Sequence, residues 1–177
     1  MKIMVPLADG FEEIEALTVV DVLRRAGINV ETVGIMGSVV LGSHSIKVMV
    51  DRRLMEVIPD EYDGIILPGG DVGVQNLGRS SKIIEILRMF DSAGKLIAAI
   101  CAAPSILAKA GILEGKKATI FPGMEKELPH PRGEKVVVDG NVITSQAAGT
   151  AMDFALIIVE NLLGRDKALA LRRQMVA

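Results

Sequence analysis

Apolar residues are concentrated in short runs along the chain, and these runs predict β-strands. The runs at 2–7, 62–70 and 95–100 are apolar at most positions, whereas 28–35 alternates between apolar and polar residues. Short runs that are apolar on both faces fit strands buried in a parallel sheet. Further short strands are expected at 117–121, 135–138 and 142–145, with a hairpin or bent strand at 39–50.

Helical segments separate these runs. Helix-forming residues fill 11–26 and stop at Gly27, a residue type that commonly ends helices because it adopts positive φ freely. The strongly apolar segment 150–163 predicts a buried helix that ends at Gly164. Other helices are expected at 75–94 in one or two pieces, at 102–110 and at 165–175, whereas 51–61 is a short helix or loop and 123–133 is a loop.

The alternation of strands and helices predicts the α/β class, with helices on both faces of a mostly parallel sheet. The sequence contains no internal repeat, linker or low-complexity segment, and 177 residues are enough to bury a substantial core. We therefore expect a single domain over residues 1–177.

Composition excludes several classes of function. The net charge is −2 and there is no arginine cluster, so nucleic acid is not an expected partner. The first apolar run is too short for a signal peptide, and no stretch approaches the roughly 20 apolar residues of a membrane helix. A chain with one cysteine cannot form an internal disulfide, and a reducing cytoplasm is the expected compartment. No metal is expected, because Cys101, His44 and His130 lack ligand spacing.

Cys101 is the first candidate site residue. It stands where the apolar strand 95–100 meets the helix expected at 102–110. A sulfur at this junction would lie near a helix N-terminus, whose unpaired N–H groups favour the thiolate and lower the thiol pKa. The alternative is a buried cysteine that acts as a small apolar residue.

Glu15 is the second candidate. The helical period places it on one stripe with residues 11, 19, 22 and 26, which are all apolar. A carboxyl group buried in an apolar stripe has a raised pKa and can exchange a proton with a neighbouring group. The alternative is a carboxylate at the edge of the helix that reaches solvent.

The remaining candidates carry weaker signals. Gly69 and Gly70 follow an apolar strand, so their N–H groups could face Cys101 as oxyanion donors, or they could form a plain turn. His44 and His130 are better explained as surface histidines. Asp21 and Arg25 are four residues apart on a helix and can form an ion pair.

The sequence resembles the ThiJ/PfpI superfamily, and most closely the branch that holds the parkinsonism-associated protein deglycase and bacterial YajL. The matching segments are LADGFEEIEALTVVDVLRRAGINV (7–30), YDGIILPGGDVGVQNL (62–77), KLIAAICAAPSILAKAGIL (95–113) and ITSQAAGTAMDFALIIVENLLGR (143–165). The resemblance implies a flavodoxin-like three-layer sandwich with a cysteine nucleophile elbow. It also implies a homodimer with the first helix, and with it Asp21 and Arg25, at the interface.

The resemblance assigns roles to individual residues. Cys101 matches the nucleophile and Glu15 the helix glutamate that hydrogen-bonds it. Gly70 and Ala102 match the residues whose N–H groups form the oxyanion site. The pocket would also include Gly69, Phe121 and Ala148.

The sequence also departs from the family pattern. Ala102 stands where proteolytic members have a histidine, which removes the obvious base for peptide cleavage. Phe121 stands where the parkinsonism-associated protein has a histidine, so acid–base chemistry at that position is excluded. That protein's Gly-Pro-Gly is Ala147-Ala148-Gly149 here, and an arginine on its dimer face is replaced near His44.

Three functions follow as hypotheses. The leading one is cofactor-free detoxification of small reactive aldehydes, such as methylglyoxal and its adducts on proteins or nucleotides, as a glyoxalase or deglycase. The second is a redox-sensing chaperone that responds to oxidative stress through Cys101. The third is an intracellular cysteine peptidase or amidase, which would need its base from a loop histidine such as His130 or from a second subunit.

Overall fold

The apolar runs of the sequence form the strands of a seven-stranded central sheet. The computed structural model describes residues 1–177. The strands are β1 (Lys2–Leu7), β2 (Asn29–Gly34), β3 (Val39–Leu41), β4 (Lys47–Met49), β5 (Arg52–Arg53), β6 (Gly64–Leu67), β7 (Leu96–Ile100), β8 (Val136–Asp139) and β9 (Val142–Ser145). The helices are α1 (Glu13–Arg25), α2 (Asp71–Arg79), α3 (Ser81–Ser92), α4 (Pro104–Lys109), α5 (Ala151–Leu163) and α6 (Arg165–Met175), with 3₁₀ turns at 54–56, 59–61, 125–127 and 148–150.

The sheet has the strand order β5-β2-β1-β6-β7-β9-β8. All pairs in it are parallel except β8 with β9, while β3 and β4 form a separate antiparallel hairpin. The chain passes from β1 to one side through β2 and then crosses to the other side at β6. The loops after β1 and β6 therefore meet at the carboxyl edge of the sheet, where open α/β sheets bind their ligands.

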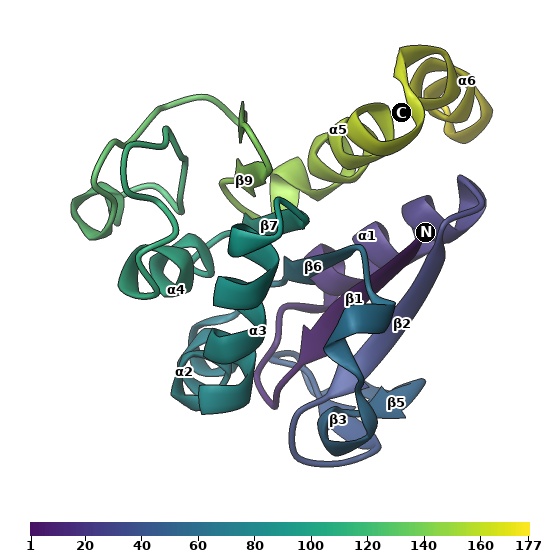
Figure 1. Cartoon of the computed structure of the whole chain (residues 1–177). Helices are drawn as coiled ribbons and strands as arrows, with labels where there is room; N and C mark the ends of the chain where they lie inside the picture. Colours follow the sequence, from purple (N-terminus) through teal and green to yellow (C-terminus); the bar gives the residue numbers. More distant parts are fainter.

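Helices cover both faces of this sheet, as the alternating pattern predicts (Figure 1). Alternate residues of β1 point to opposite faces: Ile3, Val5 and Leu7 pack with α1, α5 and α6, whereas Met4 packs with α2, α3 and α4. This two-sided burial explains why the strands are apolar at nearly every position. The predicted flavodoxin-like three-layer architecture with a mostly parallel sheet is confirmed.

Two helix boundaries have local causes. The segment expected at 75–94 begins earlier, at Asp71, and divides into two helices at Ser80, whose side chain accepts the N–H of Ile83 at 3.4 Å. The helix expected from residue 102 begins at Pro104, because proline is well placed in the first turn of a helix. Residues 101–103 form a turn before it.

The prediction of a strand at 117–121 is wrong, because no strand forms there. Only Ala118 forms a bridge, to Pro131, and the N–H of Thr119 donates to the side chain of Thr144 at 2.9 Å instead of to a strand. The segment 51–61, expected as a helix or loop, holds the two-residue edge strand β5 and two 3₁₀ turns. None of the helices is both long enough and apolar enough to cross a membrane.

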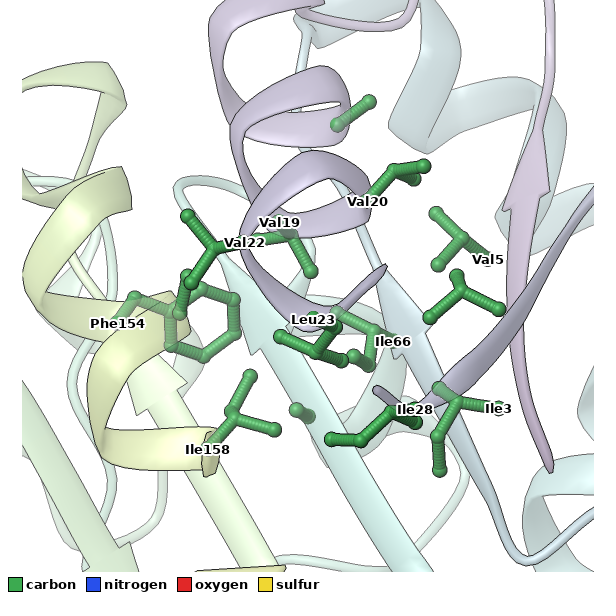
Figure 2. Packing of buried hydrophobic residues seen from close by; sticks show 14 of the residues in the cluster. Ile3, Val5, Val19, Val20, Val22, Leu23, Ile28, Ile66, Phe154 and Ile158 are labelled. Atoms are coloured by element: carbon green, nitrogen blue, oxygen red, sulfur yellow. The ribbon is translucent and has the colours of Figure 1, made fainter. Parts of the chain in front are cut away.

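Phe154 on α5 should be the most costly single truncation in the layer between α1 and α5. Its ring is fully buried against Val22 and Ile158 (Figure 2), so Phe154→Ala leaves a cavity that the two helices cannot close. We expect a loss of about 3–5 kcal/mol in the free energy of unfolding, measured by urea denaturation. Met36→Ala, at an exposed position after β2, is the control and should change it by less than about 0.5 kcal/mol.

Candidate active site

Cys101 occupies a strained turn directly after β7. Its φ of 65° lies in the left-handed region, which residues other than glycine seldom adopt. Two backbone hydrogen bonds hold it there: its N–H donates to the Ser145 carbonyl at 3.0 Å, and its carbonyl accepts the Phe121 N–H at 2.9 Å. Strain of this kind persists only where the surroundings enforce it and is common at active sites. The side chain is half-buried, so the expected elbow at residue 101 is present.

Glu15 reaches this turn from α1. All five residues of its predicted stripe are buried, and Glu15 itself is 1% exposed. Its Oε2 accepts the N–H of Gly69 at 2.8 Å. A Cβ built on Gly69 would lie 2.4 Å from this oxygen and 3.1 Å from the Cys101 sulfur, so both groups lie against the Gly69 backbone. The helix therefore points this carboxyl group inward at the sulfur and not outward to solvent.

Gly69 and Gly70 allow these groups to approach one another. A Cβ at Gly69 would lie 2.5 Å from Cys101 Cβ and would also collide with the Glu15 carboxylate. Gly70 has a φ of +92°, and a Cβ there would lie 2.7 Å from the Glu12 nitrogen. Only glycine fits at either position without displacing neighbouring atoms. The backbone N–H groups of Gly70 and Ala102 act on the Cys101 sulfur and favour its ionised form, which lowers the pKa of the thiol.

Burial sets the electrostatics of the pair. Desolvation raises the pKa of Glu15 to about 7, against the opposing effect of its hydrogen bonds from Cys101 and Gly69. Desolvation and the adjacent Glu15 carboxylate raise the pKa of Cys101 to about 12, while the Gly70 and Ala102 N–H groups act in the opposite direction. The expectation of a lowered thiol pKa is therefore wrong. The helix that we expected to lower this pKa is α4. It begins three residues after Cys101 and has six residues.

The two raised pKa values indicate that Cys101 is a neutral thiol at neutral pH and not a thiolate. The thiol would therefore give its proton to Glu15 during the reaction. Near neutral pH the Glu15 carboxyl group is divided between its two protonation states, so it can accept the thiol proton when the sulfur attacks an electrophile. The pair can thus generate its nucleophile at the moment of reaction.

The family model described as the DJ-1/PfpI family matches residues 1–161. The chain belongs to the DJ-1/PfpI family. Protein dj-1beta of Drosophila melanogaster is 44% identical over 169 residues, covering 93% of this chain and 90% of the fly protein. A protein of Pyrococcus abyssi that is named a deglycase is 34% identical over 153 residues, covering 84% of this chain and 92% of that protein.

A solved structure gives the same result for the fold. Oxidized DJ-1 of Toxoplasma gondii has a TM-score of 0.95 and 34% identity, covering 99% of this chain and 97% of that one. The resemblance found in the sequence motifs is confirmed by the family match over residues 1–161 and by these relatives.

The other residues that the sequence indicated differ in how directly they are connected to Cys101. Phe121 is partly exposed and donates its N–H to the Cys101 carbonyl, so it lies beside the elbow. Ala148 is half-buried in the 3₁₀ turn after β9, three residues beyond Ser145, which accepts the Cys101 N–H. His130 is exposed, and Asp21 pairs with Arg25 at 2.7 Å on the surface of α1.

The structure adds a charged cluster that sequence spacing did not reveal. His44 Nδ1 lies 2.9 Å from the Glu13 carboxylate and 3.6 Å from that of Glu12, and Ser43 Oγ lies 3.1 Å from both. These hydrogen bonds lower the pKa of the buried Glu13 carboxyl group to about 2 although burial raises it, and Glu13 raises the pKa of His44. The donor atoms of Glu12, Glu13 and His44 are close enough to hold a metal ion, but their hydrogen bonds already pair them.

Glu15→Gln should change the pH dependence of stability in a defined direction. The pKa of Glu15 is about 7 in the folded protein, compared with 4.5 for an unperturbed glutamate. The Glu15 carboxyl group therefore stabilises the fold fully below pH 4.5, and this contribution is lost as the pH rises through about 7. The variant keeps the acceptor for the Gly69 N–H but cannot ionise.

Urea unfolding should therefore give similar free energies for the two proteins at about pH 4. At about pH 8.5 the variant should be the more stable one by about 3 kcal/mol. Equal stability of both proteins across this range would show that the carboxyl group is not buried beside the sulfur.

Proposed function

We propose that this protein is a cysteine-dependent enzyme that detoxifies small reactive aldehydes, as a glutathione-independent glyoxalase or a deglycase. The observation that carries this proposal is the meeting of three kinds of group at one point. These are the Cys101 sulfur, the Glu15 carboxyl group with its pKa of about 7, and the N–H groups of Gly70 and Ala102. A nucleophile, a proton carrier and oxyanion donors are the parts that addition to a carbonyl needs.

In the first step the sulfur adds to the aldehyde carbon of methylglyoxal. The thiol proton passes to the Glu15 carboxylate as the S–C bond forms, and the carbonyl electrons move to the oxygen. The Gly70 and Ala102 N–H groups stabilise that oxygen until Glu15 gives it the proton taken from the thiol, which completes a hemithioacetal and leaves Glu15 as a carboxylate again.

In the second step Glu15 moves a proton between neighbouring carbons. Its carboxylate removes the hydrogen of the former aldehyde carbon while the ketone oxygen takes up a proton, which gives an enediol. Glu15 then delivers its proton to the former ketone carbon while the hydroxyl group on the sulfur-bearing carbon loses its proton, which leaves a thioester of lactate. Water then cleaves the thioester, releases lactate and restores the thiol. Methylglyoxal and water give lactic acid, so the route is balanced without an external oxidant or reductant.

The two other hypotheses use the same sulfur but fit the site less well. Peroxide sensing requires a thiolate, and the burial that raises the pKa of Cys101 opposes it. Peptide cleavage requires a general base whose conjugate acid then protonates the leaving amine. His44 is hydrogen-bonded to Glu13, His130 is exposed, and Ala102 follows the cysteine. A reducing compartment such as the cytoplasm suits an enzyme that depends on one free thiol.

Cys101→Ala should abolish the formation of lactate from methylglyoxal, because the substrate can no longer form a covalent adduct. Glu15→Gln should lower kcat by about 10²–10⁴-fold, the usual contribution of a positioned acid–base group. Lactate is measured by a coupled assay on freshly reduced protein, with Asp60→Ala, an exposed position in the 59–61 turn, as the control. Normal turnover by Cys101→Ala would overturn the proposal.

We also propose that the protein acts as a homodimer through α1 and the β3–β4 hairpin. Exposed apolar side chains lie there. Ile14 on α1 is exposed and follows Glu13, whose carboxylate accepts the N–H of His44 in the hairpin at 2.8 Å. The hairpin adds Val39, Leu41, Ile46 and Met49, all exposed. Several exposed apolar side chains on neighbouring segments are typical of an interface between subunits.

Ile14→Glu should convert the dimer to a monomer, because a carboxylate would have to lose its hydration at the apolar interface. Light scattering coupled to size exclusion measures the mass directly. Val138→Glu, at an exposed apolar position on β8 at the far edge of the sheet, should leave the mass unchanged. A wild-type mass of one chain would contradict the dimer.

A further inference from the structure

The loop that follows β1, residues 8–12, is interlocked with the loop that carries Gly70. The Glu12 N–H donates to the Gly69 carbonyl at 3.0 Å, and the Gly73 N–H donates to the Gly10 carbonyl at 3.2 Å. The Gly10 carbonyl also fills the space that a Cβ on Gly70 would need. Contacts that fix the position of the loop 8–12 therefore also fix the position of the Gly70 backbone.

Asp9 connects this loop to two other elements. Its carboxylate accepts the N–H of Leu41 at 2.8 Å, while the Leu41 carbonyl accepts the N–H of Gly10 at 2.8 Å. Its backbone carbonyl accepts the side-chain amide of Asn76 at 3.0 Å. One residue thus joins the end of β1 to the β3–β4 hairpin on one side and to α2 on the other.

These contacts fix α2 at two points along its length. The first turn is held by the bond from Gly73 to Gly10, and the middle is held by Asn76. Two points of attachment determine the direction of a helix as well as its position. Gly70 is the N-cap residue of α2, so the orientation of its N–H group follows from the orientation of the helix.

The Gly70 N–H group must be placed accurately because a hydrogen bond weakens steeply with distance and angle. Asp9 and Asn76 make no hydrogen bond with Cys101 or Glu15, and Asp9 is exposed. Any effect they have on the chemistry must act through the backbone that they hold.

We propose that Asp9 and Asn76 are positioning residues that hold the Gly70 N–H group at the Cys101 sulfur through the loop 8–12 and the first turns of α2. This role deepens the proposed aldehyde chemistry and rests on it for its effect on turnover. Its effect on the sulfur itself does not depend on any substrate.

The test compares Asp9→Ala and Asn76→Ala with two reference variants. Asp9→Asn keeps an oxygen that can accept the Leu41 N–H and should rescue function, and Asp60→Ala removes an exposed carboxylate elsewhere. Two readouts are measured on each purified protein after its fold is checked by circular dichroism. They are the steady-state kinetics with methylglyoxal and the rate of Cys101 alkylation by iodoacetamide as a function of pH.

Both alanine variants should lower kcat by about 10–100-fold with KM changed by less than about threefold, because the misplaced donor acts on the developing charge and not on binding. Their alkylation profiles should move to higher pH, since the sulfur loses a donor that stabilises its ionised form. Asp9→Asn and Asp60→Ala should follow the wild type in both readouts.

The outcomes separate the two proposals. If wild-type protein fails to convert methylglyoxal, the proposed function is wrong, and the alkylation profiles alone then decide the positioning role. Unchanged alkylation profiles in Asp9→Ala and Asn76→Ala would overturn that role, even if turnover fell. Should Asp9→Ala not fold, Asn76→Ala removes one side-chain hydrogen bond and provides the same comparison.

Discussion

The site depends on a carboxyl group and a thiol that are buried in contact with each other. Neither group is stable as an ion away from water unless a neighbour compensates its charge. Here the neighbours are the Gly69 N–H for Glu15 and the Gly70 and Ala102 N–H groups for Cys101, and together they hold a pair that shares protons near neutral pH. The thiol is therefore poised to react without being ionised in advance, which also limits its reaction with unintended oxidants.

The sheet topology provides this contact. The order in which β1 lies between β2 and β6 brings the loops after β1, β6 and β7 to one edge, so that residues far apart in the chain meet at the sulfur. Those loops approach so closely that glycine is required at residues 69 and 70, where a Cβ would strike Cys101 and Glu15 or the neighbouring loop. The strained backbone of Cys101 is a further consequence of this crowding, and bonds to Ser145 and Phe121 sustain it.

Membership of the DJ-1/PfpI family and the chemistry of the pair support one functional picture, in which an aldehyde is captured covalently and rearranged. The β3–β4 hairpin connects the proposed subunit interface with the residues that lead into the site. It exposes several apolar side chains, while backbone N–H groups of the same hairpin are bonded to Asp9, Phe11 and Glu13, which are the residues that lead into the loop and helix of the site. An interface formed on the hairpin would therefore constrain the loop 8–12, which holds the Gly70 backbone in place.

The sequence by itself determined the sandwich architecture, the elbow at Cys101 and the inward direction of Glu15, because each depends on local period: two-sided apolar runs, a strand-to-helix junction and a helical stripe. It predicted a strand at 117–121 that is absent, because strand formation requires a partner backbone and Thr119 bonds a side chain instead. It also predicted the wrong direction for the pKa of Cys101, and it did not reveal the His44–Glu13 contact or the Asp9–Asn76 connection. Those features arise between segments 31 to 67 residues apart or from burial of the pair, and only the tertiary structure decides which groups lose their water and which neighbours replace it.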